Sequence, residues 1–269
     1  MHTKVLFRVG HKNTGEREKF VATLVIDLLM DRESSDEILD RIAPYRVRFA
    51  HFQSAPDAGQ SAAVAQGFAL RDILAYLNSD DVLLPGTLNF VADFFEGHAE
   101  VDLVYSHRCF IDAENRVTGF WILPPHSNFM MRRWDLIPQE TCFWRRSLFE
   151  KIGNIDKSYG FAMDYELFVR YMLVGRFKRV NRFLAAFRIH DQAKTSTHLA
   201  SKGAKEVDDI RSRYRISFIP QSLGDMFLLS VQLCAAWFTR RHRCFPGLPP
   251  GIDYVLDEIW GRSTAESFL

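Results

Sequence analysis

The sequence predicts an α/β protein in which a mostly parallel sheet is flanked by helices and followed by C-terminal helices. In residues 1–106, short apolar runs alternate with helix-like segments. The links between them are short, which is typical of strand–helix–strand units with parallel strands. Apolar residues make up 47% of the 269 residues, an ordinary fraction for a protein with a packed core.

The apolar runs and turn signals give the order of the elements. Strands are predicted at 5–9, 23–30, 46–52, 73–77, 101–106 and 180–187, and helices at 37–42, 61–70, 85–95, 148–152 and 165–173. Ser35 or Asp36 can cap the first of these helices, and Pro85 suits a first turn. Scattered aromatic residues and a Pro-Pro-His turn predict irregular surface structure over 107–136. From about residue 200 the pattern is helical and basic.

Charge and cysteine content exclude several classes of protein. There are 34 Lys and Arg residues against 33 Asp and Glu residues, so no basic excess indicates a nucleic-acid partner. The cysteines, Cys109, Cys142, Cys234 and Cys244, form no CxxC motif, which predicts reduced, buried thiols. The N-terminus lacks the pattern of a signal peptide, and the apolar stretch 226–238 is too short to span a bilayer. We expect a cytoplasmic protein.

Carboxylates follow two of the predicted strands. Asp31 ends one strand, and Asp80 and Asp81 follow another in the segment LNSDD. Parallel sheets bind ligands at the carboxyl ends of their strands, and paired carboxylates supply the oxygen ligands that hard divalent cations prefer. The alternative is a solvated pair that begins a loop, as expected for Asp208 and Asp209 on a predicted surface helix.

Three further residues have two readings each. Asp164, at the start of a predicted helix, is either a general base or an acid that interacts with the helix dipole. His190 is either a metal or phosphate ligand or a structural histidine, and Lys194 either contacts a phosphate or is solvated.

Six separated segments, taken together, resemble bacterial family 2 glycosyltransferases. In chain order they are PDAGQSAAVAQGFAL, ILAYLNSDDVLLPGTL, VDLVYSHRCFIDAENRV, IPQETCFWRRSLFEKIGNID, FAMDYELFVRYMLVGRF and FLAAFRIHDQAKTS. The resemblance spans roughly residues 22–200. It implies a GT-A (Rossmann-like) fold and an inverting, metal-dependent hexosyl transfer from a nucleoside diphosphate sugar to an acceptor hydroxyl. The implied setting is cell-surface polysaccharide or glycoconjugate synthesis.

The same resemblance implies a role for each matching residue. Asp164 is the implied catalytic base, and Asp81 and His190 are the implied ligands of Mn²⁺ or Mg²⁺. The implied nucleotide-binding residues are Asp31, Asp57, Gln60, Asn78, Asp80 and Lys194. The implied acceptor-binding residues are Gln139, Glu140 and Trp144.

The implied organisation has three parts. Residues 1–106 form the nucleotide-sugar-binding half, 107–200 the acceptor-binding and catalytic half of the same domain, and 201–269 a C-terminal helical extension. The expected partners are a UDP-sugar and a glycan or lipid-linked acceptor, with no nucleic acid. The segment MFLLSVQLCAAWFTRRHR is either an interfacial helix at the inner face of the membrane or a core-packing helix that closes the domain.

The N-terminal part departs from the family pattern. The first helix is shortened, and Ala62 and Ala65 stand where the family often has Asp and Asn. A catalytically weak GT-A-like protein that binds a nucleotide or glycan is therefore the alternative. A nucleotidyltransferase ranks last, because the chain lacks a Gly-rich, basic phosphate loop near its first strand.

Overall fold

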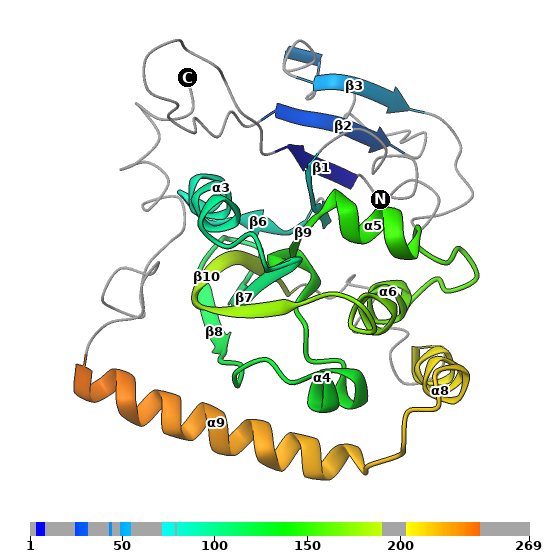
Figure 1. Ribbon diagram of the computed structural model, residues 1–269. Coiled ribbons are helices and arrows are strands. Elements are labelled where there is room, and N and C mark those ends of the chain that lie inside the picture. Colours follow the sequence, from blue (N-terminus) through cyan, green and yellow to red (C-terminus); the bar gives the residue numbers. More distant parts are fainter. Residues whose placement is uncertain are drawn as a thin grey trace.

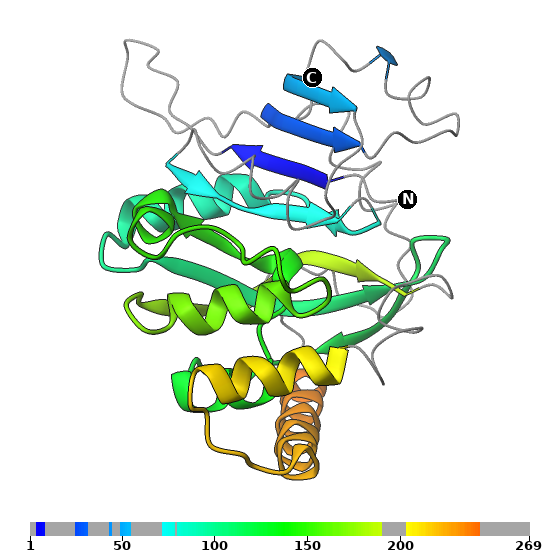
Figure 2. The same cartoon turned by 90° about the vertical axis from the view of Figure 1, so that its right-hand side faces the viewer.

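The computed structural model describes residues 4–8, 25–31, 43–44, 49–54, 72–78, 80–189 and 203–242. For the residues up to 54 that lie in strands, and for the last part of the final helix, it describes the backbone. Two sheets lie one above the other, with helices beside the lower one and a long helix at the far end (Figures 1 and 2).

The described strands form two mixed sheets. The first has the order β3-β2-β1-β5, and the second has the order β4-β9-β7-β10-β6 with β8 paired to β7. The first sheet is built from β1 (Lys4–Arg8), β2 (Val25–Asp31), β3 (Phe49–Ser54) and β5 (Tyr76–Asn78). The second is built from β4 (Ile73–Leu74), β6 (Val82–Leu83), β7 (Leu103–Ile111), β8 (Val117–Trp121), β9 (Phe143–Arg145) and β10 (Phe177–Arg188).

The prediction of a mostly parallel sheet is wrong for these strands. Only β2 with β3 and β7 with β10 run parallel, whereas the other described pairs are antiparallel. The reason is local connectivity: β8 returns beside β7 through a tight hairpin, which antiparallel strands permit without a crossover helix. The predicted helices 37–42 and 61–70 lie outside the described residues.

The apolar run predicted as one strand at 73–77 is two strands in different sheets. Leu74 of β4 pairs with Trp144 of β9, whereas Tyr76 of β5 pairs with Leu6 of β1. The chain therefore passes from one sheet to the other at Ala75. The other predicted strands are confirmed, with bounds shifted by a few residues.

Residues 107–136 are not irregular, contrary to the sequence prediction. β7 continues to Ile111, turns at Asn115 and returns as β8, and α4 (Asn128–Trp134) follows. The segment also contributes buried residues, among them Leu123 and Met131. The aromatic residues that look scattered in the sequence include β-strand positions whose side chains alternate between the two faces.

The remaining helices cover the second sheet and extend beyond it. They are α3 (Thr87–Gly97), α5 (Arg146–Ile152), α6 (Met163–Tyr171), α8 (Ala204–Arg213) and α9 (Gln221–His242), with a 3-10 turn, η3, at Gln139–Thr141. The first follows Gly86, whose φ of 76° is readily adopted only by glycine. Figure 1 shows α9 along the edge of the molecule, beyond α4.

The main core lies between the second sheet and α6. Trp144 of β9 is fully buried and makes edge-on contacts with Tyr76, Phe168 and Tyr171. The prediction of reduced cysteines holds for the three thiols that the structure describes. Cys109 and Cys142 are buried as predicted, whereas Cys234 is exposed on α9.

Candidate functional site

The Asp80–Asp81 loop joins the two sheets. It follows β5 of the first sheet and leads directly into β6 of the second. The Asp81 side chain is buried, with 6% of the residue exposed. Its Oδ2 accepts a hydrogen bond from Asn78 Nδ2 at 3.0 Å, and its Oδ1 accepts one from the Arg188 backbone N–H at 3.1 Å. The loop is therefore an integral part of the structure rather than a freely solvated pair.

Asp31 lies at the same edge of the first sheet as this loop. Met30 of β2 and Asn78 of β5 both pair with Lys4 of β1, one on each side. Asp31 follows Met30, so its backbone lies about two strand spacings, roughly 10 Å, from that of Asn78. The register thus brings two of the predicted nucleotide-binding positions to one edge.

Arg188, which the sequence analysis did not single out, fixes the loop from the other side. Its Nε donates to the Asp80 carbonyl at 2.8 Å. Its terminal nitrogens donate to the Asp112 carbonyl and to Asn115 Oδ1, each at 2.6 Å. The end of β10, the β7–β8 turn and the acidic loop are therefore held together by one guanidinium. Residue 190 follows two positions later.

Arg108 and Glu140 form a second connection that the sequence did not reveal. Arg108 Nε and Nη2 donate to the two Glu140 oxygens, both at 2.7 Å, and only 1% of the Glu140 side chain is exposed. The guanidinium also lies 4.6 Å from the ring centre of Phe187 and 5.2 Å from that of Trp121. The sequence signal for this pair was weak, because it consisted only of a basic residue, Arg108, among residues that form a strand.

Acidic groups crowd this region. Burial, with smaller contributions from Glu140 and Asp80, raises the pKa of Asp81 to about 7. Burial lowers the pKa of Arg108, but Glu140, with help from Asp81 and Asp164, more than offsets this and raises it overall. One guanidinium thus lies within electrostatic range of three carboxylates.

Asp135 adds a fourth acid, which the sequence analysis also missed. It ends α4 in the left-handed conformation, with φ of 47°. The residue keeps an exposed surface, yet the protein around its carboxyl raises the pKa to about 8, chiefly by desolvation and then by the charge of Asp164.

Asp164 faces this same region from α6. It is half-buried in the first turn of the helix, and its Oδ1 accepts the Tyr165 backbone N–H at 2.9 Å. Its charge also contributes, after burial, to a raised pKa of the Tyr76 hydroxyl. The predicted first-turn position of Asp164 is confirmed, and its carboxylate lies near the group around Arg108.

The residues predicted to line the acceptor pocket are buried and contact other parts of the protein. Gln139 Nε2 donates to the Tyr76 carbonyl at 2.6 Å, and Glu140 is paired with Arg108. Trp144 has no exposed surface. All three side chains are therefore buried, and their role in acceptor binding stays a prediction. Asp57, Gln60, His190 and Lys194 lie outside the described residues, as does the Asp31 side chain.

The carboxylates around Asp81 fit a divalent cation that a bound phosphate group would also coordinate. Among the residues that the structure describes, no three His, Cys, Asp or Glu side chains are grouped closely enough to hold a metal ion. Mg²⁺ in phosphate-handling sites uses one or two carboxylates, with the remaining ligands from phosphates and water. A buried aspartate beside further acids, within electrostatic range of Arg108, fits that arrangement.

Comparisons with known proteins point to one class of enzyme. No protein-family model matches the sequence. Two relatives from Mycobacterium tuberculosis, from strains CDC 1551 / Oshkosh and ATCC 25618 / H37Rv, are both called uncharacterized glycosyltransferases. Each is 27% identical to this chain over 154 residues, which is 55% of this chain and 57% of the relative. The match thus spans little more than half the length of these relatives.

A solved structure was also compared. The crystal structure of S. aureus TarS has a TM-score of 0.47 with this chain at 15% sequence identity. The superposition covers 76% of this chain and 37% of TarS. The support for a glycosyltransferase comes from the sequence shared with the two mycobacterial relatives, which are called glycosyltransferases.

Proposed function

We propose that this chain is an inverting, metal-dependent family 2 glycosyltransferase of GT-A type. It moves a hexose from a UDP-sugar to an acceptor hydroxyl in cell-surface polysaccharide or glycoconjugate synthesis. The observation that carries the proposal is that the charges of Asp81 and Asp164 both act on Arg108. These two acids come from separate elements of the chain and are the two that the family resemblance implies as metal ligand and base.

The donor binds at the edge formed by the first sheet and the acidic loop. Asp31 and Asn78 lie there on either side of β1, and Asp80 contacts the nucleoside side. Asp81 would hold Mn²⁺ or Mg²⁺ together with the diphosphate oxygens, with His190 from the segment that follows Arg188. The bound cation stabilises the negative charge that builds on the departing diphosphate.

Transfer takes place in a single displacement. The acceptor oxygen bonds to the anomeric carbon as the bond from that carbon to the diphosphate oxygen breaks, and the nucleoside diphosphate leaves with the electron pair. The Asp164 carboxylate takes the acceptor proton. Because one base acts and no covalent intermediate forms, the anomeric configuration inverts.

The Arg108–Glu140 pair supports this chemistry by offsetting the repulsion between Asp81 and Asp164. The guanidinium offsets part of the charge of Asp81 and Asp164, and its two hydrogen bonds to Glu140 fix its position. Rigid placement matters because repulsion between the acids would otherwise spread them.

The acceptor is lipid-linked in this proposal, and α9 meets an anionic lipid surface. Leu223, Met226 and Leu229 are each more than half exposed. In the sequence the apolar spacing continues with Leu233 and Trp237 and ends at three arginines in the segment TRRHR, whereas Asp225 is the one acid of α9. Apolar residues followed by a basic cluster favour an interfacial helix. Within the described residues, none of the helices is both long and apolar enough to cross a bilayer.

Vesicle flotation tests the lipid contact. The chain is expected to float with vesicles that contain about a third phosphatidylglycerol and to stay in solution with purely zwitterionic vesicles, since basic segments bind anionic surfaces. Met226→Gln with Leu229→Gln should weaken binding. Absence of flotation, or self-association through this face seen by light scattering, would remove the lipid proposal and leave the rest intact.

A thermal-shift titration tests the proposed function itself. UDP with Mn²⁺ is expected to raise the melting temperature, because a ligand that binds only the folded state stabilises it. Release of UDP from UDP-hexoses should then require an acceptor. Binding of UDP without any release would favour the alternative, a catalytically weak nucleotide-binding or glycan-binding protein. No shift with any nucleoside diphosphate would overturn the donor assignment.

A further inference from the structure

We infer that Glu206 of α8 is a positioning residue that holds Asp164 in place. Its carboxylate accepts three consecutive backbone N–H groups, from Gly160 at 3.2 Å and from Phe161 and Ala162 at 2.8 Å. Ala162 is the residue just before α6, and Asp164 is in the first turn of that helix. Asp164, the proposed base, is thus two residues after Ala162, which Glu206 holds from 44 positions later in the chain.

The three N–H groups that Glu206 accepts belong to the turn just before α6 and not to its first turn. Ala162 makes no side-chain capping hydrogen bond, and within the first turn Tyr165 N–H donates to Asp164 Oδ1. A carboxylate at this end also interacts favourably with the positive end of the helix dipole. Glu206 therefore fixes, from another helix, the turn that leads into α6 and positions its first residues.

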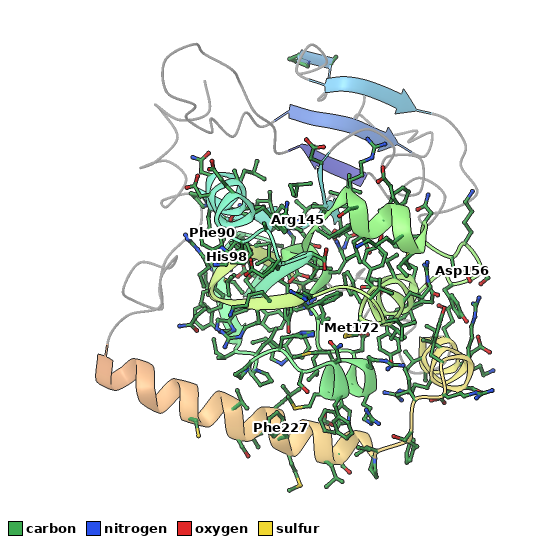
Figure 3. All side chains as sticks on the ribbon, viewed as in Figure 1. Phe90, His98, Arg145, Asp156, Met172 and Phe227 are labelled. Carbon is green, nitrogen blue, oxygen red and sulfur yellow. The ribbon has the colours of Figure 1, made fainter. Side chains whose placement is uncertain are left out.

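Further contacts fix α8 against the same segment. Tyr159 donates its hydroxyl hydrogen to Asp209, and Arg213 contacts Asp156 at 2.9 Å. A Cβ at Gly203 would lie 2.7 Å from the Phe161 ring, so the two meet closely. Figure 3 shows Asp156 beside α8. Because α8 is docked at several points, the Glu206 carboxylate is itself held rigidly.

The functional part of this inference rests on the proposed function of Asp164. A general base must lie within hydrogen-bond reach of the proton that it removes. If the anchor is lost, the first turn of α6 gains freedom and Asp164 spends less time in reach. The donor edge, formed by β2, β5 and the acidic loop, contains no residue of α8. The loss therefore falls on the chemical step and not on donor binding.

Glu206→Gln and Glu206→Ala test the inference with two readouts. Hydrogen exchange of the peptide that covers residues 160–166 should accelerate in both variants. With UDP-hexoses and Mn²⁺, kcat should fall about 10-fold for Glu206→Gln and about 100-fold for Glu206→Ala, with the donor KM changed less than about 2-fold. The glutamine keeps one acceptor oxygen, hence the smaller effect.

Asp208→Asn is the matched control on the same helix. Its side chain is 74% exposed and lies 3.6 Å from Arg211, so both readouts should match wild type. Unchanged exchange in the Glu206 variants, or faster exchange with wild-type kcat, would overturn the inference. If the wild-type chain transfers no sugar, the proposed function fails, and hydrogen exchange alone decides whether Glu206 holds the start of α6.

Discussion

Arg108 and Glu140 form a two-point ion pair, with both N–O distances at 2.7 Å, in a region where carboxylates outnumber cations. The pair connects β7 to η3, the turn just before β9, which itself pairs with β7. Glu140 is almost fully buried, whereas 17% of the Arg108 side chain reaches solvent. Both charges therefore depend on each other for compensation.

Breaking this pair should destabilise the fold. Arg108→Met leaves the Glu140 carboxylate buried and uncompensated, which typically costs about 3–5 kcal/mol. Glu140→Gln leaves Arg108 without its counter-charge, but with solvent access, so a smaller loss is expected. The double variant should recover part of the loss of Arg108→Met, as measured by urea unfolding. Additive losses would show that the two side chains are not coupled.

Asp164→Asn and Asp81→Asn should separate the two halves of the proposed reaction. Asparagine cannot take the acceptor proton, so kcat should fall at least about 100-fold for Asp164→Asn. The Mn²⁺-dependent thermal shift with UDP should remain. For Asp81→Asn, both that shift and the transfer should be lost, with circular dichroism unchanged. Wild-type transfer by the Asp164 variant would return that residue to a plain helix-start acid.

His107 is a buried histidine whose hydrogen bonds fix it in the neutral form. Its Nδ1 accepts the Leu123 backbone N–H at 3.0 Å, so the ring proton is on Nε2, which lies 2.9 Å from Asn181 Oδ1. Burial lowers the pKa of His107 to about 4, and the nearby Arg179 adds to the shift. A second ring proton would point at the Leu123 N–H, which is a donor.

This arrangement predicts a pH-dependent stability. The unfolded chain takes up the proton near pH 6.5 and the folded chain near pH 4, so the unfolded state binds more protons between these values. The contribution of His107 is therefore complete above about pH 6.5 and is lost as the pH falls toward 4, by roughly 3 kcal/mol in all. Urea unfolding at several pH values should show a flatter profile for His107→Gln. An identical slope would contradict the low pKa.

The sequence predicted those features that depend on local pattern. Apolar runs located most of the strands, and the position of Asp164 in the first turn of α6 followed from helix periodicity. The placement of Asp31 and of the Asp80–Asp81 loop at strand ends followed from the apolar runs that precede them. These signals need only neighbouring residues.

Features that depend on distant pairing could not be predicted. The split at Ala75 is decided by partners at Leu6 and Trp144, from opposite ends of the domain. Similarly, an arginine within a strand pattern does not reveal which acid it will meet, so Arg108 was missed. The same limit applies to α9, where apolar residues occur on all sides and only the fold decides which side is covered.

The side of α9 that packs against α4 gives the last prediction. Gly224 of α9 packs on Trp134 of α4, and a Cβ at this glycine would lie 2.8 Å from three atoms of the indole ring. Phe227 stacks on the same ring, with 6.4 Å between ring centres, and Figure 3 shows it between the two helices. Gly224→Ala should therefore destabilise the protein by about 1–3 kcal/mol through overpacking, although alanine favours a helix by about 1 kcal/mol.

Gly97→Ala is the matched control for this change. Gly97 ends α3, and a Cβ there would meet no atom within 4 Å. The melting temperature of Gly97→Ala should equal or slightly exceed that of wild type. The melting temperature of Gly224→Ala should fall by several degrees, because about 1 kcal/mol corresponds to a few degrees in a domain of this size. Equal melting temperatures for the two variants would mean that α9 does not pack on α4 through Gly224, and the whole helix would then be free to bind a surface.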